Sequence, residues 1–191
     1  MSDMRSMSDM RSKRRHSGYT MMELLMTVVI VAILGSIAVP GFKYVTSSNR
    51  IATEVNGLLG DIQFARSQAV KEGLSVTLCT STSGTGCTNT DWELGWIVFL
   101  DSNSNQAVEA GESIIRTQPG FGGTDTFIAT PNTFHALTFN RMGYAPTGAA
   151  TAINITLHDS TGNTNWTRCV AINPIGSAVT EKYGIGTPSC N

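Results

Sequence analysis

The chain has 191 residues, a length that allows one globular domain with an appended segment. Its net charge of -1 is unevenly distributed, because residues 1–18 carry a net charge of +3 and residues 19–191 carry -4. An acidic body argues against a protein that binds nucleic acid through bulk charge. A basic start before an apolar segment is typical of an N-terminus that stays in the cytoplasm.

The first 18 residues read as a short leader. Residues 1–12 repeat MSDMRS, so both Met1 and Met7 are candidate start residues. A basic cluster at 13–16 then leads to Ser17 and Gly18, directly before an apolar run.

A single long helix is predicted after the leader, from about Thr20 to about Glu72. Leu24–Val39 contains no charged residue, and together with residues 19–23 it reaches the ~20 residues needed to cross a bilayer. Pro40 interrupts the apolar pattern but need not end the helix. Gly73 is a plausible C-terminal cap.

The second half of this helix is predicted to be amphipathic, with apolar residues at helical spacing on one face. These residues are Val45, Ile51, Val55, Leu58, Leu59, Ile62, Ala65 and Ala69. Charged residues are expected elsewhere around the helix, at Lys43, Arg50, Glu54, Asp61, Arg66 and Lys71.

From residue 74 onward, short β-prone runs alternate with stretches rich in Gly, Ser, Thr and Asn, which is typical of an antiparallel sheet. The expected strands are Ser75–Cys79, Gly95–Leu100, Ser113–Gln118, Thr126–Ala129, Ala136–Phe139, Ile153–His158 and Arg168–Ile172. A helix followed by strands predicts an α+β fold in which the amphipathic helix covers one face of the sheet.

The four cysteines form two local groups, Cys79 with Cys87 and Cys169 with Cys190. Four cysteines allow three connectivities, and the sequence alone does not choose among them. We favour the two local disulfides because each closes a short loop. A zinc site is the competing interpretation, but the chain has no CxxC motif. Disulfides indicate an oxidising compartment such as the periplasm.

Glu23 is an acid inside the first turns of the apolar run, where an unpartnered charge is unfavourable. Cleavage after Gly18 would create an α-ammonium group at Tyr19, about one helical turn from Glu23. That ammonium, or the one of a neighbouring subunit, could pair with Glu23 and fix the axial register of an assembly. Alternatively, Glu23 lies at the membrane surface and is hydrated by headgroups.

The segment from Gly18 through Glu23, with the apolar run and Pro40, resembles the class III leader and N-terminal helix of type IV pilins and type II secretion pseudopilins. The resemblance implies that a prepilin peptidase cuts after Gly18 and N-methylates Tyr19. It also implies that Glu23 and Pro40 belong to the assembly half of the helix. The first residue is usually Phe, so Tyr19 departs mildly from the pattern.

Downstream segments resemble the GspH/FimT family of minor pseudopilins. They are Leu58–Val70, the hairpin formed by Gly95–Asp101 and Ile114–Arg116, and Phe139–Gly143. The aromatic residues Phe64, Trp96 and Phe99 in these segments are expected to pack in the core. The implied organisation is a cleaved leader (1–18), a transmembrane half-helix (19–40), an amphipathic half-helix (41–73) and a periplasmic β-rich domain (74–191).

Two other groups of residues give only weak evidence for a metal site or a catalytic site. Oxygen ligands between Asp101 and Glu112 follow part of the EF-hand spacing, but Gln106 stands where that loop needs Gly, so a polar hairpin turn is the better account. His135 and His158 lie in strand-like runs without a nucleophile motif. We therefore expect no metal, no cofactor and no enzymatic activity.

Nucleic acid is also not an expected partner. Some members of the resembled family bind DNA and are associated with a Gly-Arg-x-Arg motif near the C-terminus. In this chain the corresponding stretch starts at Gly176, and the arginine positions hold Ser177 and Val179. Without these cations, phosphate contacts are lost.

The resemblance implies a single-pass inner-membrane protein that is assembled into a type IV pilus or a type II secretion pseudopilus. Expected partners are prepilin peptidase, other pilins or pseudopilins and an inner-membrane assembly platform. DNA uptake is one rival function. A second rival is a secreted globular domain behind an ordinary signal peptide, which would be cut after Ala38 so that the mature chain starts at Val39.

Overall fold

The computed structural model describes residues 18–145, 152–186 and 190. The predicted leader, apart from Gly18, lies outside these residues. The chain divides into two compact units, of which the second begins at Tyr44. The second half of the long helix and all of the strands therefore belong to one unit.

The long helix α1 spans Met21–Glu72, 52 residues, which agrees with the predicted bounds to within one residue. It continues through Pro40, as the sequence allowed. At its end Gly73 has a φ of 67°, and its N–H donates a hydrogen bond of 3.1 Å to the carbonyl of Ala69. Glycine adopts this left-handed conformation without steric conflict, so Gly73 terminates the helix as predicted.

The other elements of the described residues are a short 3₁₀ helix and eight strands, all paired antiparallel. Their bounds are η1 Trp92–Leu94, β1 Val76–Thr80, β2 Gly95–Leu100, β3 Ile114–Pro119, β4 Thr126–Thr130, β5 Ala136–Phe139, β6 Ile153–His158, β7 Arg168–Ile172 and β8 Ala178–Lys182. The seven predicted strands agree with β1 to β7 within one residue at each end, whereas β8 was missed.

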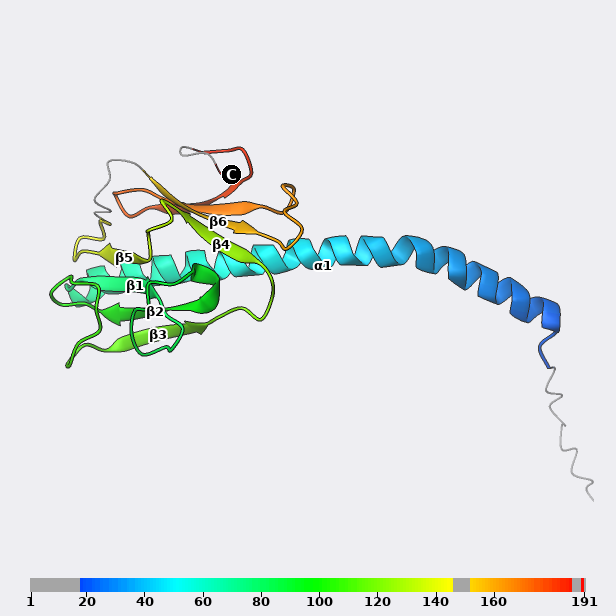
Figure 1. The fold of residues 1–191 in the computed structure, drawn as a ribbon, viewed down its shortest axis with the longest axis horizontal. Coiled ribbons are helices and arrows are strands. Elements are labelled where there is room, and N and C mark those ends of the chain that lie inside the picture. Colours follow the sequence, from blue (N-terminus) through cyan, green and yellow to red (C-terminus); the bar gives the residue numbers. More distant parts are fainter. Residues whose placement is uncertain (1–17, 146–151, 187–189, 191) are drawn as a thin grey trace, which may run out of the picture. The chain divides into compact units, whose positions relative to one another are not determined.

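The strands form two sheets, where a single sheet was expected. One sheet has the order β3-β2-β1-β5 and the other β4-β6-β7-β8. Figure 1 shows the two as separate layers, with the second half of α1 running along the domain. The sequence marks individual strands through local alternation, but strand pairing between distant segments leaves no comparable local pattern.

The main core lies where the amphipathic half of α1 meets both sheets. Its helix residues are Ile51, Val55, Leu58, Ile62, Ala65 and Ala69, each at most 2% exposed. Val76, Leu78, Trp96 and Val98 contribute from the first sheet, and Ile155, Leu157, Val170 and Ile172 from the second. The helical periodicity of the apolar residues therefore predicted most of the buried face. Val45 is an exception, since it is 55% exposed, and Leu59 is only partly buried. Trp96 and Phe99 are fully buried as expected, whereas Phe64 is partly buried against the core.

Asp61 joins the helix to the β2–β3 hairpin. Its carboxylate accepts a hydrogen bond of 2.8 Å from the indole Nε1 of Trp96 and pairs with the Nη1 of Arg116 at 2.6 Å. The Arg116 guanidinium also lies 4.3 Å from the centre of the Phe64 ring. Asp61 was expected only as a charge elsewhere around the helix, yet it is just 7% exposed. A buried carboxylate is tolerated here because both of its oxygens are partnered.

Both disulfides join the cysteine pairs that the sequence favoured. Cys79–Cys87 links β1 to the loop that follows it, and Cys169–Cys190 links β7 to the C-terminal segment. Each closes a local loop, with 8 and 21 residues of separation respectively. The first bridge therefore restricts a loop that has no helix or strand, whereas the second closes a segment that contains β8 and fixes the chain beyond that strand.

Candidate functional site

The start of α1 presents the predicted cleavage and assembly residues. Gly18 and Tyr19 precede the helix and are exposed, Tyr19 to 84%. Thr20 acts as the N-cap, because its hydroxyl accepts a hydrogen bond of 3.2 Å from the backbone N–H of Glu23. Glu23 itself lies in the first turn, where a negative charge interacts favourably with the helix dipole.

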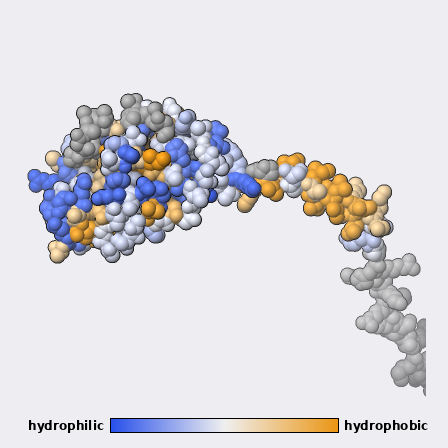
Figure 2. Space-filling model, viewed as in Figure 1, coloured by the Kyte–Doolittle hydropathy of each residue, from blue (hydrophilic) through white to orange (hydrophobic). Residues whose placement is uncertain are grey.

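The apolar half of α1 is exposed along its length. Figure 2 shows the large apolar side chains as a nearly continuous hydrophobic surface. Every large hydrophobic residue between Met21 and Val39 is at least 46% exposed. Within the described part of the chain, α1 is the one helix that is long and apolar enough to cross a membrane.

Two hydroxyl-bearing residues, Thr27 and Ser36, lie within this apolar surface. The hydroxyl of Thr27 donates 2.8 Å to the carbonyl of Leu24, and that of Ser36 donates 2.7 Å to the carbonyl of Ile33. Each hydroxyl is therefore satisfied within the helix, as is required in a medium that offers no water. The segment suits lipid, or the apolar helices of other subunits.

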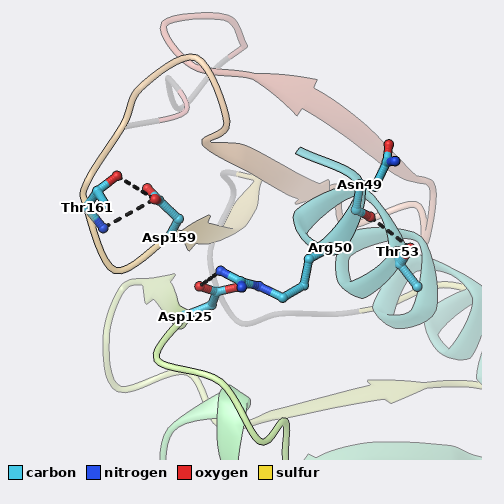
Figure 3. A network of polar contacts seen from close by, with 6 residues as sticks. All are labelled: Asn49, Arg50, Thr53, Asp125, Asp159 and Thr161. Carbon is cyan, nitrogen blue, oxygen red and sulfur yellow. Dashed lines mark hydrogen bonds and ion pairs between the residues drawn. The ribbon is translucent and has the colours of Figure 1, made fainter. Parts of the chain in front are cut away.

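At the start of the globular unit, an ion pair fastens α1 to the loop before β4 (Figure 3). The Nε and Nη2 of Arg50 donate to the two carboxylate oxygens of Asp125 at 2.5 and 2.6 Å. The Asp125 side chain is fully buried, while that of Arg50 is 41% exposed. The bidentate geometry raises the pKa of Arg50 and fixes the orientation of both groups.

Two further acids lie near Arg50. Burial raises the pKa of Glu54 to about 7, repulsion from Asp125 adds to that rise, and Arg50 opposes it. Glu54 is 6% exposed, and its Oε2 has no hydrogen-bond partner among the described residues. Burial alone would raise the pKa of Asp159, but hydrogen bonds from Thr161 and the Asn163 N–H, with the charge of Arg50, lower it.

The sequence missed this acidic network. Arg50 and Glu54 were expected simply as charges around the helix, and Asp125 lies 75 positions beyond its partner. The one available signal was the i, i+4 spacing of Arg50 and Glu54, which does not reveal that Glu54 is buried.

The loop between β2 and β3 is a closed polar turn. Asp101 is fully buried and accepts hydrogen bonds from the Thr77 hydroxyl (2.6 Å) and from the Asn105 and Gln106 N–H groups (both 3.0 Å). Protein donors also occupy oxygens of Glu109 and Glu112. Among the described residues, no group of three His, Cys, Asp or Glu side chains is placed to hold a metal ion.

The two histidines among the described residues occupy different surroundings. His135 helps to line an open cavity of about 510 Å³ beside β5, whose other walls include Asn89, Gln106 and Thr138. His158 lies at the end of β6, with its Nδ1 3.4 Å from the hydroxyl of Thr167. Neither histidine forms a hydrogen bond to a carboxylate within the described parts of the chain.

The stretch that corresponds to the Gly-Arg-x-Arg motif forms the β7–β8 turn. Gly176 has a φ of 80° and lies against the carbonyl of Gly143. The Ser177 N–H donates 2.9 Å to the side-chain oxygen of Asn173, and Val179 belongs to β8. Arg66 reaches this turn from α1, donating 3.3 Å to the carbonyl of Ile175.

Two family models match the chain. The model described as "Type II transport protein GspH" matches residues 54–176, which include the end of α1 from Glu54 to Glu72 and β1 to β7. The model described as "Prokaryotic N-terminal methylation motif" matches residues 13–39, which include Gly18, Tyr19 and Glu23.

Among curated proteins, the chain is 30% identical over 107 residues to the pilin-like protein PilA1 of Thermus thermophilus. The match covers 55% of this chain and 61% of PilA1, so it spans less than two thirds of that relative.

Among solved structures, the fold is similar to that of the type IV minor pilin FimU of Pseudomonas aeruginosa in two crystal forms. The TM-scores are 0.55 and 0.51, at 22% and 23% identity. Both matches cover 75% of this chain, with 96% and 99% of the FimU chains. The fold is thus that of a type IV pilin, and because the GspH model covers more than half of the chain, the protein belongs to the GspH family and carries a pilin-type N-terminal methylation motif.

Proposed function

We propose that this protein is a minor pilin or pseudopilin that is cut after Gly18, N-methylated on Tyr19 and assembled into a type IV pilus or a type II secretion pseudopilus. The observation that carries the proposal is the direct junction of a small residue, Gly18, with an exposed apolar helix that has a single acid in its first turn. Neither an ordinary signal peptide nor the core helix of a soluble protein needs an acid at that point.

Glu23 can act in assembly by pairing with a positive charge in an apolar medium. Cleavage releases the α-ammonium group of Tyr19, four residues from Glu23, a rise of about 6 Å along a helix. Two opposite charges in lipid attract strongly, because the surroundings screen them weakly. Pairing the ammonium of one subunit with Glu23 of the next satisfies both groups and sets the stagger between them.

The remaining expectations follow from this role. The apolar half of α1 holds the subunit in the inner membrane with its N-terminus in the cytoplasm, where prepilin peptidase acts. The globular unit then lies in the periplasm, where both disulfides can persist. An inner-membrane platform supplies the subunit to a filament of other pilins or pseudopilins.

The mature N-terminus tests the proposal. Intact-mass analysis of the protein purified from membranes should find a chain that starts at Tyr19 and carries one added methyl group. A chain that starts at Val39 would identify an ordinary secreted protein and would refute the proposal.

The role of Glu23 is tested separately. We expect Glu23→Gln to be cleaved and inserted normally but to be depleted from the sheared filament fraction. Glu72→Gln, which removes an exposed acid at the far end of α1, should enter filaments like the unchanged chain. Equal incorporation of the two variants would show that Glu23 has no part in assembly.

A further inference from the structure

An open cavity of about 410 Å³ lies on the globular unit, apart from the residues assigned to cleavage and assembly. Its walls are Tyr44, Thr164, Asn165, Arg168, Lys182 and Tyr183. These residues come from α1, from the loop before β7, and from the β7 and β8 region. The cavity therefore combines two cations with two phenol groups and has no acidic lining residue.

The two cations are neighbours on adjacent strands of the second sheet. Arg168 of β7 and Lys182 of β8 are direct partners in the antiparallel register. Like charges in directly opposite positions repel and destabilise a sheet. No described carboxylate forms an ion pair with either of them. Two neighbouring cations without a carboxylate partner are expected where a bound anion supplies the negative charge.

The guanidinium group of Arg168 is already oriented. Its Nη1 donates to the carbonyls of Asn165 at 2.9 Å and Thr167 at 2.8 Å. Its Nε and Nη2, and the Nζ of Lys182, have no hydrogen-bond partner among the described residues. These donors remain available for the oxygens of one phosphate group, which arginine binds through two adjacent N–H groups.

Aromatic side chains complete the cavity. The ring of Tyr44 packs edge-on against Trp166, with 5.4 Å between ring centres. Tyr44 and Tyr183 remain 53% and 47% exposed. Tyrosine and tryptophan beside lysine and arginine form the composition that membrane proteins place at the lipid–water interface.

The position of Tyr44 in the chain indicates the source of the anion. Tyr44 follows Val39, the last residue of the apolar run, by five positions. Along a helix that separation is about 8 Å, the depth of a headgroup layer rather than of bulk solvent.

We propose that this cavity binds the phosphate group of an anionic glycerophospholipid at the periplasmic surface of the inner membrane. The inference rests on the proposed function, because it needs residues 19–40 to span the bilayer. A long polyanion suits the cavity less well, since the rest of the globular unit is acidic and repels additional phosphates.

The test uses the full chain purified in detergent and native mass spectrometry. The lipid probes are phosphatidylglycerol and phosphatidylcholine, added in equal amounts. The unchanged chain should retain phosphatidylglycerol preferentially. Lys182→Gln and Arg168→Gln should each lower that retention about fivefold, the effect expected of one cation near an anionic surface. Arg141→Gln, which removes an exposed cation outside the cavity, should have no effect.

Several results would overturn the inference. They are equal loss in the Arg141→Gln control, equal retention of the two lipids, full displacement of lipid by inorganic phosphate, and preferential retention of a short DNA oligonucleotide. Protease protection of the chain in vesicles is measured in parallel. A chain that fails to insert refutes both proposals, whereas insertion with unchanged lipid preference in Lys182→Gln refutes this one alone.

Discussion

Arg50 and Asp125 form a two-point ion pair that ties the first turns of α1 within the globular unit to the loop before β4. The pair joins positions 75 residues apart, with the carboxylate fully buried. It therefore fixes this part of the helix to the loop before β4, while Asp61, further along α1, fixes the helix to Trp96 and Arg116.

Asp125→Asn should destabilise the globular unit by about 2 kcal/mol, because it removes the charge that partners Arg50 and leaves a buried amide in its place. Urea unfolding of the detergent-solubilised chain, followed by circular dichroism, measures the change. Glu72→Gln is the matched control, since it breaks the exposed pair with Lys71 and should cost no more than about 0.5 kcal/mol. Equal losses in the two variants would contradict the structural role of Asp125.

Glu54 should make stability depend on pH near neutrality. Its pKa in the folded chain, about 7, lies above its ordinary value of 4.5, so the fold favours the protonated form. The stabilisation is complete below pH 4.5 and is lost as the pH rises through 7. Glu54→Gln should therefore be more stable than the unchanged chain at pH 8, by on the order of 1 kcal/mol, and similar to it at pH 4.

The free energy of unfolding of Glu54→Gln and of the unchanged chain, measured at pH 4 and pH 8, tests this prediction. A constant difference between Glu54→Gln and the unchanged chain across this range would show that the carboxyl does not titrate there.

Gly176 should tolerate substitution far less than Gly162, although both have a positive φ, of 80° and 64°. A Cβ at Gly176 would collide with the backbone carbonyl of Gly143, whereas a Cβ at Gly162 would meet open space. We expect Gly162→Ala to cost about 1 kcal/mol and Gly176→Ala at least about 3 kcal/mol. Melting temperatures that fall equally in the two variants would disprove the close contact.

Removing the Cys169–Cys190 disulfide with a double Cys→Ala variant should cost about 2–4 kcal/mol. The loss of structure should begin in the C-terminal segment, because this bridge holds that segment to β7. Limited proteolysis should cut first beyond Lys182 and leave the β1–β2 region intact. First cleavage between Cys79 and Cys87 would contradict this assignment.

Local patterns predicted most of the fold. The apolar spacing in α1 identified the buried residues from Ile51 to Ala69, and β-prone runs placed seven strands. The strand β8 was missed because only Ala178 of its five residues is buried and it ends in two charged residues, Glu181 and Lys182. Burial is what gives a strand its apolar alternation, so a strand with one buried residue carries a weak signal.

The residues of the candidate site also differ in how far local sequence could predict them. Gly18, Tyr19 and Glu23 could be predicted as cleavage and assembly residues because the pattern that singles them out lies in neighbouring positions of the sequence. The partners of Arg50, Asp61 and Arg168 depend on segments that are brought together only by folding. Glu54 and Asp61 were expected only as charges elsewhere around the helix, and nothing in the local pattern indicated that both are buried.

Asp61 has a mechanical consequence for a subunit that is held by its helix. Sliding α1 along the domain would break its hydrogen bond to Trp96 and its ion pair with Arg116 at the same moment. A pull on the helix is therefore shared with the β2–β3 hairpin through these two contacts. Tension along α1 would move helix and hairpin together before it separated them.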